Sequence, residues 1–410
     1  MKNIIDRFLD YVKYDTQSED DVEAFPSTKG QRVLLSHIAG ELESIGLSDV
    51  SMDEYGYVFA TLPSNIDKKV PTVGFISHVD TSPEISDSNV NPIITKNYDG
   101  NNIVLNKEEN IILSTDEFPS IKKYKGHTII TTDGTTLLGA DDKAGVAEIV
   151  TAMEYLVNHP EIKHGDVRVG FTPDEEVGRG VDFFNVQKFN ADFAYTLDGG
   201  ELGDLNYENF NAAKATITIN GVSVHTGSAK NIMKNSVLIG NELLALLPQN
   251  ETPSTTEGYE GFYHVDYFEG NVDKATIKYI IRDFHMDGLE AKKNKFIEIA
   301  EILNKKYGKD TVIIDIKDQY YNMADKIKEN MYIIDTAKKA MESIGVAPKI
   351  SPIRGGTDGS RLSYMGLLTP NLFTGGANFH GRYEYIPVSS MEKAVELIIK
   401  IIDIIYNDKK

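Results

Sequence analysis

The distribution of apolar and polar positions along the first half of the chain predicts an α/β protein. Apolar residues that return every three or four positions are typical of helices, and short apolar runs bounded by turn residues are typical of buried strands. The predicted helices are 2–14, 29–46 and 144–158. The predicted strands are 57–62, 70–77, 128–132, 166–171 and 193–197. Strands that alternate with helices in this way favour one α/β sheet.

The pattern changes near residue 213, where 214–221 alternate between apolar and polar residues as a half-exposed strand does. Elements predicted after this strand are a helix at 230–247, a strand at 275–282, a helix at 286–307 and a strand at 311–316. They form a compact α+β unit. Beyond residue 320 the first pattern resumes, with helices at 328–344 and 389–406 around a strand at 372–374. We therefore expect a discontinuous larger domain, 1–212 and 319–410, with a smaller domain, 213–318, inserted into it.

Composition narrows the classes of function. A chain of 410 residues is too long for one ordinary core, which agrees with two domains. Lys and Arg number 42 against 62 Asp and Glu, and this excess of negative charge argues against a nucleic-acid or anionic-membrane partner. There is no cysteine, so disulfides and thiolate metal sites are excluded. Neither a signal peptide nor an apolar stretch of about 20 residues is present, and we expect a cytoplasmic protein.

Polar side chains with metal-binding chemistry occur where predicted elements begin or end. His78, the pair Glu175–Glu176 and Asp198 each follow a predicted strand, Asp141 precedes a helix, and His380 lies in a Gly-rich loop. Each has an ordinary alternative: Asp141 as a helix N-cap, His78 as a structural histidine, the glutamates as a solvated turn, Asp198 as part of an ordinary turn, and His380 as a loop histidine. Ligands of α/β sheets gather at the carboxyl ends of strands, however. Together these residues suit zinc, manganese or cobalt, and they suffice for two ions that share a bridging carboxylate.

Longer motifs carry a family resemblance. They are GFISHVDTSPE, TLLGADDKAG, GFTPDEEVGRG, TLDGG, TEGYEGFYH, YIIRDFH, PIRGGTDGS and NLFTGGANFHG, in this order. With them the chain resembles, from about residue 7 to 400, the tripeptide aminopeptidases of the dizinc aminoacylase/carboxypeptidase-like metallopeptidase family. The resemblance implies a mixed-sheet zinc-peptidase catalytic domain with an inserted α+β lid or dimerisation domain. It also implies two Zn²⁺ per subunit, with Mn²⁺ or Co²⁺ as substitutes, tripeptide substrates and a homodimer formed through the inserted domain.

The resemblance assigns roles position by position. The implied metal ligands are His78, Asp141 as the bridge, Glu176, Asp198 and His380. The implied catalytic residues are Asp80, Glu175 and His225. In these roles Asp80 orients His78, Glu175 is the general base, and His225 stabilises the oxyanion. The implied substrate-binding residues are Arg282, Arg354 and Asn378. The family also implies a cis peptide bond between Asp141 and Asp142. Thr226 stands where the family usually has a proline after the histidine.

The implied reaction is release of the N-terminal residue of a tripeptide by a metal-bound hydroxide, with Glu175 as the base. Alternatives on the same scaffold are a dipeptidase, a carboxypeptidase or an aminoacylase. A non-catalytic peptide-binding protein is a further alternative, although a binding protein has no need of Glu175. Structural roles also remain open for three residues: a buried or capping role for His225, and ion pairs for Arg282 and Arg354.

Overall fold

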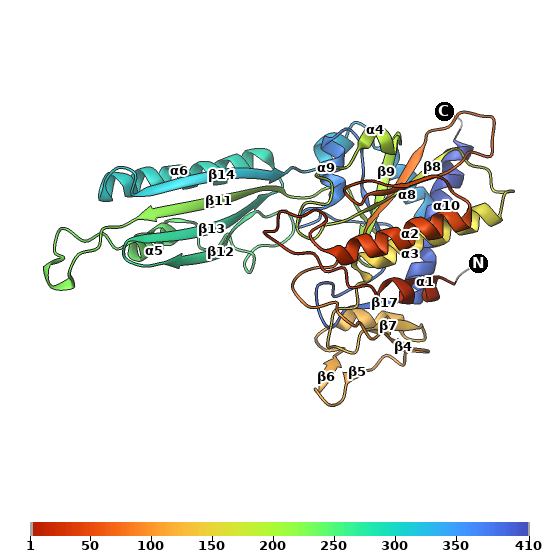
Figure 1. Ribbon diagram of the computed structural model, residues 1–410, viewed down its shortest axis with the longest axis horizontal. Helices are drawn as coiled ribbons and strands as arrows, with labels where there is room; N and C mark the ends of the chain where they lie inside the picture. The colour runs from red at the N-terminus through yellow and green to blue at the C-terminus, as the bar shows by residue number, and fades with distance from the viewer. Residues whose placement is uncertain (1–2, 409–410) are drawn as a thin grey trace. The chain divides into compact units, whose positions relative to one another are not determined.

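A computed structural model describes residues 3–408 (Figure 1). The chain divides into two compact units. The first unit comprises Met1–Tyr207, Asp325–Ser351 and Thr357–Lys410, and the second comprises Glu208–Ala324 and Pro352–Gly356. The sequence pattern predicts an inserted domain at 213–318, and it includes residues 352–356 in the larger domain. The lid or dimerisation role of the second unit stays a prediction.

The first unit is built on a mixed sheet of eight strands in the order β1-β2-β8-β3-β9-β16-β10-β15. β8, β3, β9 and β16 run parallel to one another in this series. β2 is antiparallel to both β1 and β8, whereas β10 is antiparallel to β16 and parallel to β15. The strands are β1 (Ser48–Met52), β2 (Val58–Leu62), β3 (Val73–His78), β8 (Val167–Thr172), β9 (Phe193–Gly199), β10 (Asp204–Asn206), β15 (Lys349–Ile350) and β16 (Asn371–Phe373). The predicted mixed α/β fold is confirmed.

Helix α3 (Ala140–Asn158) packs against β3 and β9 and is flanked by α10 (Val388–Asn407). Its sequence is apolar or small on nearly every side, which is typical of a helix enclosed in a core. The other helices of this unit are α1 (Ile4–Tyr11), α2 (Lys29–Ile45), α4 (Val186–Phe189), α8 (Tyr332–Ser343) and α9 (Asp358–Tyr364), and α7 (Ala324–Ile327) begins at the last residue of the second unit.

An aromatic cluster that includes Tyr57, Phe59 and Phe189 covers β2, β8 and β3. Two glycines of the sheet leave room for the ring of Phe189. A Cβ atom at Gly74 would lie 2.5 Å from that ring, and one at Gly170 would lie 2.9 Å from it. Glycine at these positions therefore lets an aromatic side chain pack directly on the strand backbone.

A smaller apolar cluster supports the loops around the first unit's sheet. It is formed by a three-stranded sheet, β17-β7-β4, a two-stranded hairpin and a 3₁₀ helix. These elements are β4 (Ile93–Thr95), β5 (Ile103–Asn106), β6 (Ile111–Leu113), η1 (Pro119–Tyr124), β7 (Ile129–Thr131) and β17 (Tyr385–Pro387). Because β7 precedes the Asp141 loop and β17 follows the His380 loop, this sheet fixes one end of each.

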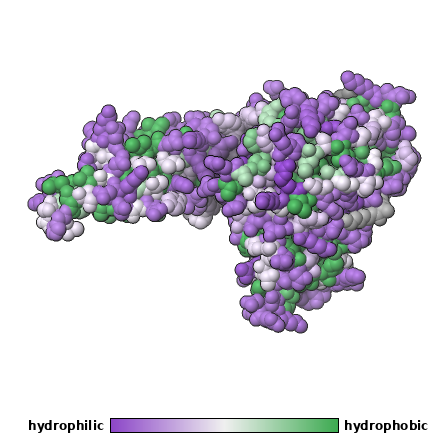
Figure 2. All heavy atoms as spheres, viewed as in Figure 1, coloured by the Kyte–Doolittle hydropathy of each residue, from purple (hydrophilic) through white to green (hydrophobic). Residues whose placement is uncertain are grey.

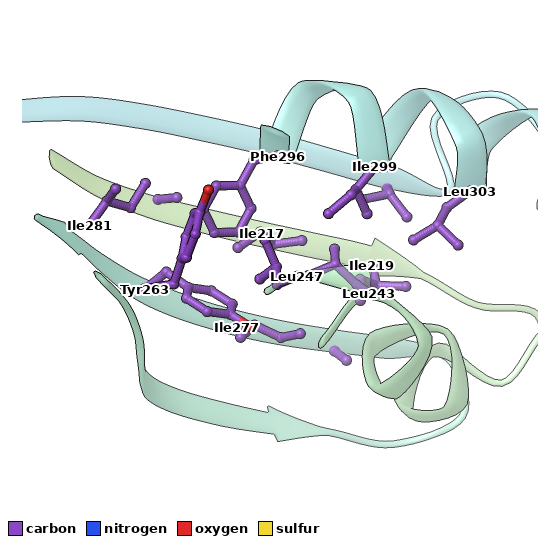
Figure 3. Close-up of a cluster of buried hydrophobic side chains, with 14 of the residues drawn as sticks. Ile217, Ile219, Leu243, Leu247, Tyr263, Ile277, Ile281, Phe296, Ile299 and Leu303 are labelled. Atoms are coloured by element: carbon purple, nitrogen blue, oxygen red, sulfur yellow. The ribbon is translucent and has the colours of Figure 1, made fainter. Parts of the chain in front are cut away.

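The second unit is an antiparallel sheet in the order β12-β13-β11-β14. Its elements are β11 (Asn211–Asn220), η2 (Thr226–Ser228), α5 (Ser236–Leu246), β12 (Phe262–Gly270), β13 (Lys274–Asp283), α6 (Met286–Tyr307) and β14 (Val312–Tyr320). Ile217 and Ile219 of β11 point into a core that Leu243 of α5 and Phe296 of α6 complete (Figure 3). On the opposite face of β11, Lys214 and Asn220 are exposed and Thr216 and Thr218 are half-buried, so the predicted period-two strand has one buried face.

Hydrophilic residues dominate the surface in Figure 2, with hydrophobic residues in small patches between them. This agrees with the composition of the chain, in which 25% of residues are charged. Over residues 3–408, no helix combines the length and the apolar character that crossing a bilayer requires.

Candidate metal centre

Three parallel strands of the first unit end at the same edge of the sheet, and candidate ligands lie at or just beyond the carboxyl end of each. His78 is the last residue of β3 and lies opposite Thr172, the last residue of β8. The turn after β8 carries Glu175 and Glu176, and Asp198 lies near the end of β9. Carboxyl ends of adjacent parallel strands meet at one sheet edge, which is why these separate segments converge.

His78 lies at the centre of one side of this cluster and is 2% exposed. Its Nε2 atom is 3.0 Å from Asp141 Oδ1 and 3.5 Å from Asp198 Oδ1. Its Nδ1 atom is 3.0 Å from the carbonyl oxygen of Asp80. A hydrogen on Nδ1 donated to that carbonyl leaves the Nε2 lone pair facing the two carboxylates, as a metal-binding imidazole requires.

His380 occupies the corresponding position on the other side. Its Nε2 atom is 3.0 Å from Glu176 Oε2 and 3.4 Å from Asp141 Oδ2. Asp141 thus directs one carboxylate oxygen toward each histidine, which is the arrangement of a bridging ligand. The predicted ligands His78, Asp141, Glu176, Asp198 and His380 are brought together by these contacts.

The Asp141–Asp142 peptide bond is cis, so that expectation is confirmed. Asp142 contacts the end of β3 through its carboxylate. Its Oδ2 atom accepts hydrogen bonds from the Ser77 hydroxyl and from the backbone N–H of His78. Ligand atoms of His78, Asp142 and Asp198 lie within 4.8 Å of one another, as do those of His78, Asp141 and Glu176. Since one oxygen of Asp142 already holds the end of β3, Asp141 is the better placed bridge.

Burial and charge make this cluster favourable for cations. Burial raises the pKa of Glu176 to about 7, and the nearby Asp141 adds to the effect. Burial lowers the pKa of His380, but Asp141 and Glu176 more than offset it, and the pKa reaches about 11. His78 follows the same pattern: burial lowers its pKa, and Asp141 and Asp198 raise it further than burial lowers it. The surroundings thus favour positive charge at both Nε2 atoms.

The donor set fits two divalent cations. Three carboxylates and two imidazoles are the oxygen and nitrogen ligands that zinc takes in proteins. One carboxylate oxygen of Glu176, Oε1, is buried and has no hydrogen-bond partner within the described residues. A buried carboxylate oxygen without a donor costs free energy, and a bound cation would remove that cost.

Asp80 and Glu175 lie beside the ligands. The Asp80 carboxylate is fully buried and accepts hydrogen bonds from the backbone N–H groups of Glu175, at 3.0 Å, and Glu176, at 3.1 Å. Its Oδ1 atom is also 3.3 Å from His78 Nδ1. Asp80 therefore contacts His78, the histidine that it was expected to orient, and also the turn that carries Glu175. Glu175 Oε1 accepts a hydrogen bond from the N–H of Asp358, at 3.2 Å.

The remaining predicted site residues are placed as follows. Asn378, in the first unit, donates to the carbonyl of Tyr383. His225, in the second unit, is exposed and its Nδ1 accepts the N–H of Gly227, which is a capping contact. Arg282 donates through Nη1 to Gln319 Oε1 and lies over the ring of Tyr320.

Arg354, also in the second unit, uses two of its nitrogens within that unit. Nη1 donates to the carbonyls of Gly258 and Glu260, and Nη2 donates to the hydroxyl of Thr256. Its guanidinium group also lies over Phe210 and Phe262. The structural alternative for Arg354 was an ion pair, whereas the structure shows hydrogen bonds to backbone carbonyls at this position. Arg282 likewise meets the neutral Gln319 and backbone carbonyls through Nη1.

Sequence reasoning missed several residues that contact the cluster. Glu84 lies 3.2 Å from Nδ1 of His380, and Thr357 donates its hydroxyl to Asp198, at 3.3 Å. Glu384 accepts hydrogen bonds from the loop that leads to Asp141. Thr357 and Asp358 belong to the motif PIRGGTDGS, which was noted only for the family resemblance. Glu384 follows His380 by four positions and carried no separate signal.

Comparison with known proteins shows the same architecture in solved structures. A crystal structure of the aminopeptidase PepT from Bacillus cereus superposes with a TM-score of 0.78 over 99% of this chain and 98% of that chain, at 24% identity. A dinuclear metal-binding peptidase of the M20 family from Bacillus subtilis superposes with a TM-score of 0.66 over 98% and 97% of the two chains, at 13% identity. At these identities the likeness establishes the fold, an M20 peptidase fold that includes the inserted domain.

Sequence relatives are much closer. Peptidase T of Halothermothrix orenii is 61% identical over 404 residues, which cover 98% of this chain and 99% of the relative. Peptidase T of Caldanaerobacter subterraneus subsp. tengcongensis is 60% identical with the same coverage. Residues 131–404 match the family described as Peptidase family M20/M25/M40. The chain therefore belongs to this peptidase family, as a metallo-aminopeptidase within it.

Proposed function

We propose that this protein is a cytoplasmic dizinc aminopeptidase that releases the N-terminal residue of tripeptides, with Glu175 as the general base. The observation that carries the proposal is Asp141, whose two oxygens face His78 and His380, with Glu175 on the adjacent turn. Relatives at 57–61% identity over nearly the whole chain are named Peptidase T, which supports the substrate class.

His78 and Asp198 would hold one zinc ion, Glu176 and His380 would hold the other, and Asp141 would bridge them. When bound, a pair of divalent cations polarises a peptide carbonyl and lowers the pKa of water toward about 7. Glu84 lies beside Nδ1 of His380 and the Asp80 carbonyl lies beside Nδ1 of His78, so each ring would keep Nε2 available to hold an ion.

Glu175 has the position and the environment of a proton carrier. Asp80 holds its backbone N–H, and the N–H of Asp358 donates to its carboxylate. Burial, and then the charge of Asp198, raise the pKa of Glu175 well above its usual range, so it accepts a proton more readily near neutral pH. In the proposed reaction Glu175 removes a proton from the attacking water and returns it to the amine that leaves.

We further propose that the second unit acts as a lid or a dimerisation domain, and that it supplies substrate contacts. His225 would stabilise the oxyanion, and Arg282 and Arg354 would bind the substrate's far carboxylate, with Asn378 beside it. A guanidinium group suits a terminal carboxylate because both are planar and pair through two hydrogen bonds. Because two nitrogens of Arg354 already hold the 256–260 loop, Arg282 is the stronger candidate of the two.

The function is tested with zinc-loaded protein, a tripeptide substrate and two variants. Glu175→Gln removes the base but keeps the size of the side chain, and Glu298→Gln alters an exposed ion pair in the second unit. We expect Glu175→Gln to lose at least about 10²-fold in kcat, since general acid–base catalysis contributes about 10²–10⁴-fold. Zinc content stays at the wild-type value, and Glu298→Gln behaves as the wild type. Near-normal turnover by Glu175→Gln would remove the base assignment.

Peptides with blocked ends separate the alternatives. An aminopeptidase loses activity when the N-terminus is acetylated, whereas a carboxypeptidase or an aminoacylase does not. A dipeptidase prefers dipeptides over tripeptides under the same conditions. Tight binding of tripeptides without turnover in zinc-loaded protein would favour the non-catalytic binding protein.

A further inference from the structure

The loop that leads into Asp141 is held by a buried carboxylate from the far end of the chain. Glu384 is 1% exposed. Its carboxylate accepts hydrogen bonds from the backbone N–H groups of Leu138, at 2.7 Å, Gly139, at 2.8 Å, and Asp141, at 3.1 Å. One side chain thus binds three of the four N–H groups in the segment 138–141.

These N–H groups are available to a side chain because they lie at the N-terminal end of α3, where N–H groups have no partner within the helix. Gly139 has a φ of +81°, and Asp141 and Asp142 have non-helical backbone angles although they are included in α3. Consecutive N–H groups in such a loop point to one side and form a concave site for an anion. Glu384 fills that site, so the position of the Asp141 backbone depends on this carboxylate.

The same segment of chain also supplies a candidate ligand. His380 precedes Glu384 by four residues, and its Nε2 atom contacts both Glu176 and Asp141. The N–H of Glu384 closes a turn with the carbonyl of Gly381, and Tyr385 pairs with Ala377 through two backbone hydrogen bonds. His380 and the anchor of the Asp141 loop therefore lie in one hydrogen-bonded segment of chain.

We propose that Glu384 is a positioning residue that sets the place of the bridging carboxylate Asp141 relative to His380 and thereby the affinity of the centre for metal. This inference rests on the proposed metal centre and extends it to a residue outside the proposed set of ligands. Because Asp141 is shared, loss of the Glu384 contacts lowers the affinity for both ions.

The substitution Glu384→Gln keeps the shape and removes the charge. An amide offers one oxygen acceptor, and its NH₂ group meets N–H donors that it cannot bind, so at least one of the three hydrogen bonds is lost. Replacing a partner that orients a metal ligand typically costs 10–100-fold in metal affinity. Glu384→Asp keeps the charge but shortens the side chain by one methylene, so a smaller loss is expected.

Zinc affinity provides the test. Full-length wild type, Glu384→Gln and Glu384→Asp are freed of metal with a chelator and titrated with Zn²⁺ against a chromophoric competitor, and the thermal unfolding of each metal-free protein is recorded. Glu41→Gln is the matched control, because Glu41 is a largely buried carboxylate that binds Arg7 and Tyr11 away from the candidate centre. We expect Glu384→Gln to bind zinc about 10–100-fold more weakly, and Glu41→Gln to lose thermal stability but keep wild-type zinc affinity.

Three outcomes overturn the inference: wild-type zinc affinity in Glu384→Gln, an equal loss of affinity in Glu41→Gln, or failure of both Glu384 variants to fold where the control folds. Failure of the proposed function has a different signature. A wild-type protein that binds two zinc ions and does not hydrolyse tripeptides would refute the activity and leave the affinity comparison valid.

Discussion

The substitution Asp80→Asn tests whether one buried carboxylate aligns the whole catalytic turn. In the structure, the two oxygens of Asp80 accept the N–H groups of Glu175 and Glu176, and Oδ1 is also close to His78 Nδ1. Asparagine has nearly the same shape but only one acceptor oxygen. Its NH₂ group would face a backbone N–H, so one of the two hydrogen bonds to the turn must be lost.

The magnitude follows from the charge on the acceptor. A hydrogen bond to a charged group contributes about 1.5–3 kcal/mol, and about 1.4 kcal/mol corresponds to a factor of ten. Loss of one bond therefore predicts a fall of roughly 10–100-fold in kcat/KM. Because Glu175 makes its largest contribution in the transition state, we expect most of the change in kcat and little in KM.

The assay is tripeptide hydrolysis at saturating zinc, with zinc content measured on the same samples. Asp182→Asn is the control, since Asp182 forms partly exposed ion pairs with Arg179 and Arg361 in the same unit. This control should keep nearly full activity, because such pairs contribute about 0–1 kcal/mol to stability. If Asp80→Asn kept kcat/KM within about twofold of the wild type, the charge-assisted contacts would not position the turn.

Two further predictions concern the first unit outside the candidate centre. Arg7 is 1% exposed and bonds to Glu41, Glu154 and Thr151. The substitution Arg7→Met should therefore lower the free energy of unfolding by about 3–5 kcal/mol in urea titrations. The control Lys122→Met removes an exposed pair with Asp116 and should change the free energy of unfolding by less than about 1 kcal/mol. Equal effects of the two substitutions would contradict the assigned burial. Glu148 is fully buried, and neither of its oxygens has a hydrogen-bond partner among the described residues. Burial raises the pKa of Glu148 well above the usual value, and Asp142 adds to the shift. The folded state therefore binds the proton more tightly than the unfolded state does, and the stability falls as the pH rises above about 4.5. Glu148→Gln removes this contribution, and its melting temperature relative to the wild type should rise between pH 5 and pH 8; a constant difference would show that Glu148 does not titrate in this range.

Much of the fold was readable because burial leaves a period in the sequence. The helix predicted at 286–307 has those bounds, and the strand predicted at 275–282 is β13. Strand β12 was missed because a register irregularity between Val265 and Tyr267 breaks its alternation and most of its residues are exposed. Helix α9 was not predicted, since Gly355, Gly356 and Gly359 hide a short helix that is capped by Thr357.

The residue types of the candidate centre were also readable, because His and carboxylates at the ends of apolar strands are conspicuous. Their supporting contacts were not, since these join a side chain to backbone N–H groups far away in the chain. Asp80 binds the N–H of Glu175 across 95 positions, and Glu384 binds that of Asp141 across 243. Every backbone has N–H groups, so no pattern of residues marks which of them will be paired. The two carboxylates hold the turn of Glu176 and the loop of Asp141 in place, and the separation of the proposed ligands depends on both. Substitutions at Asp80 and Glu384 therefore test the geometry of the centre, whereas substitutions of the ligands test only its composition.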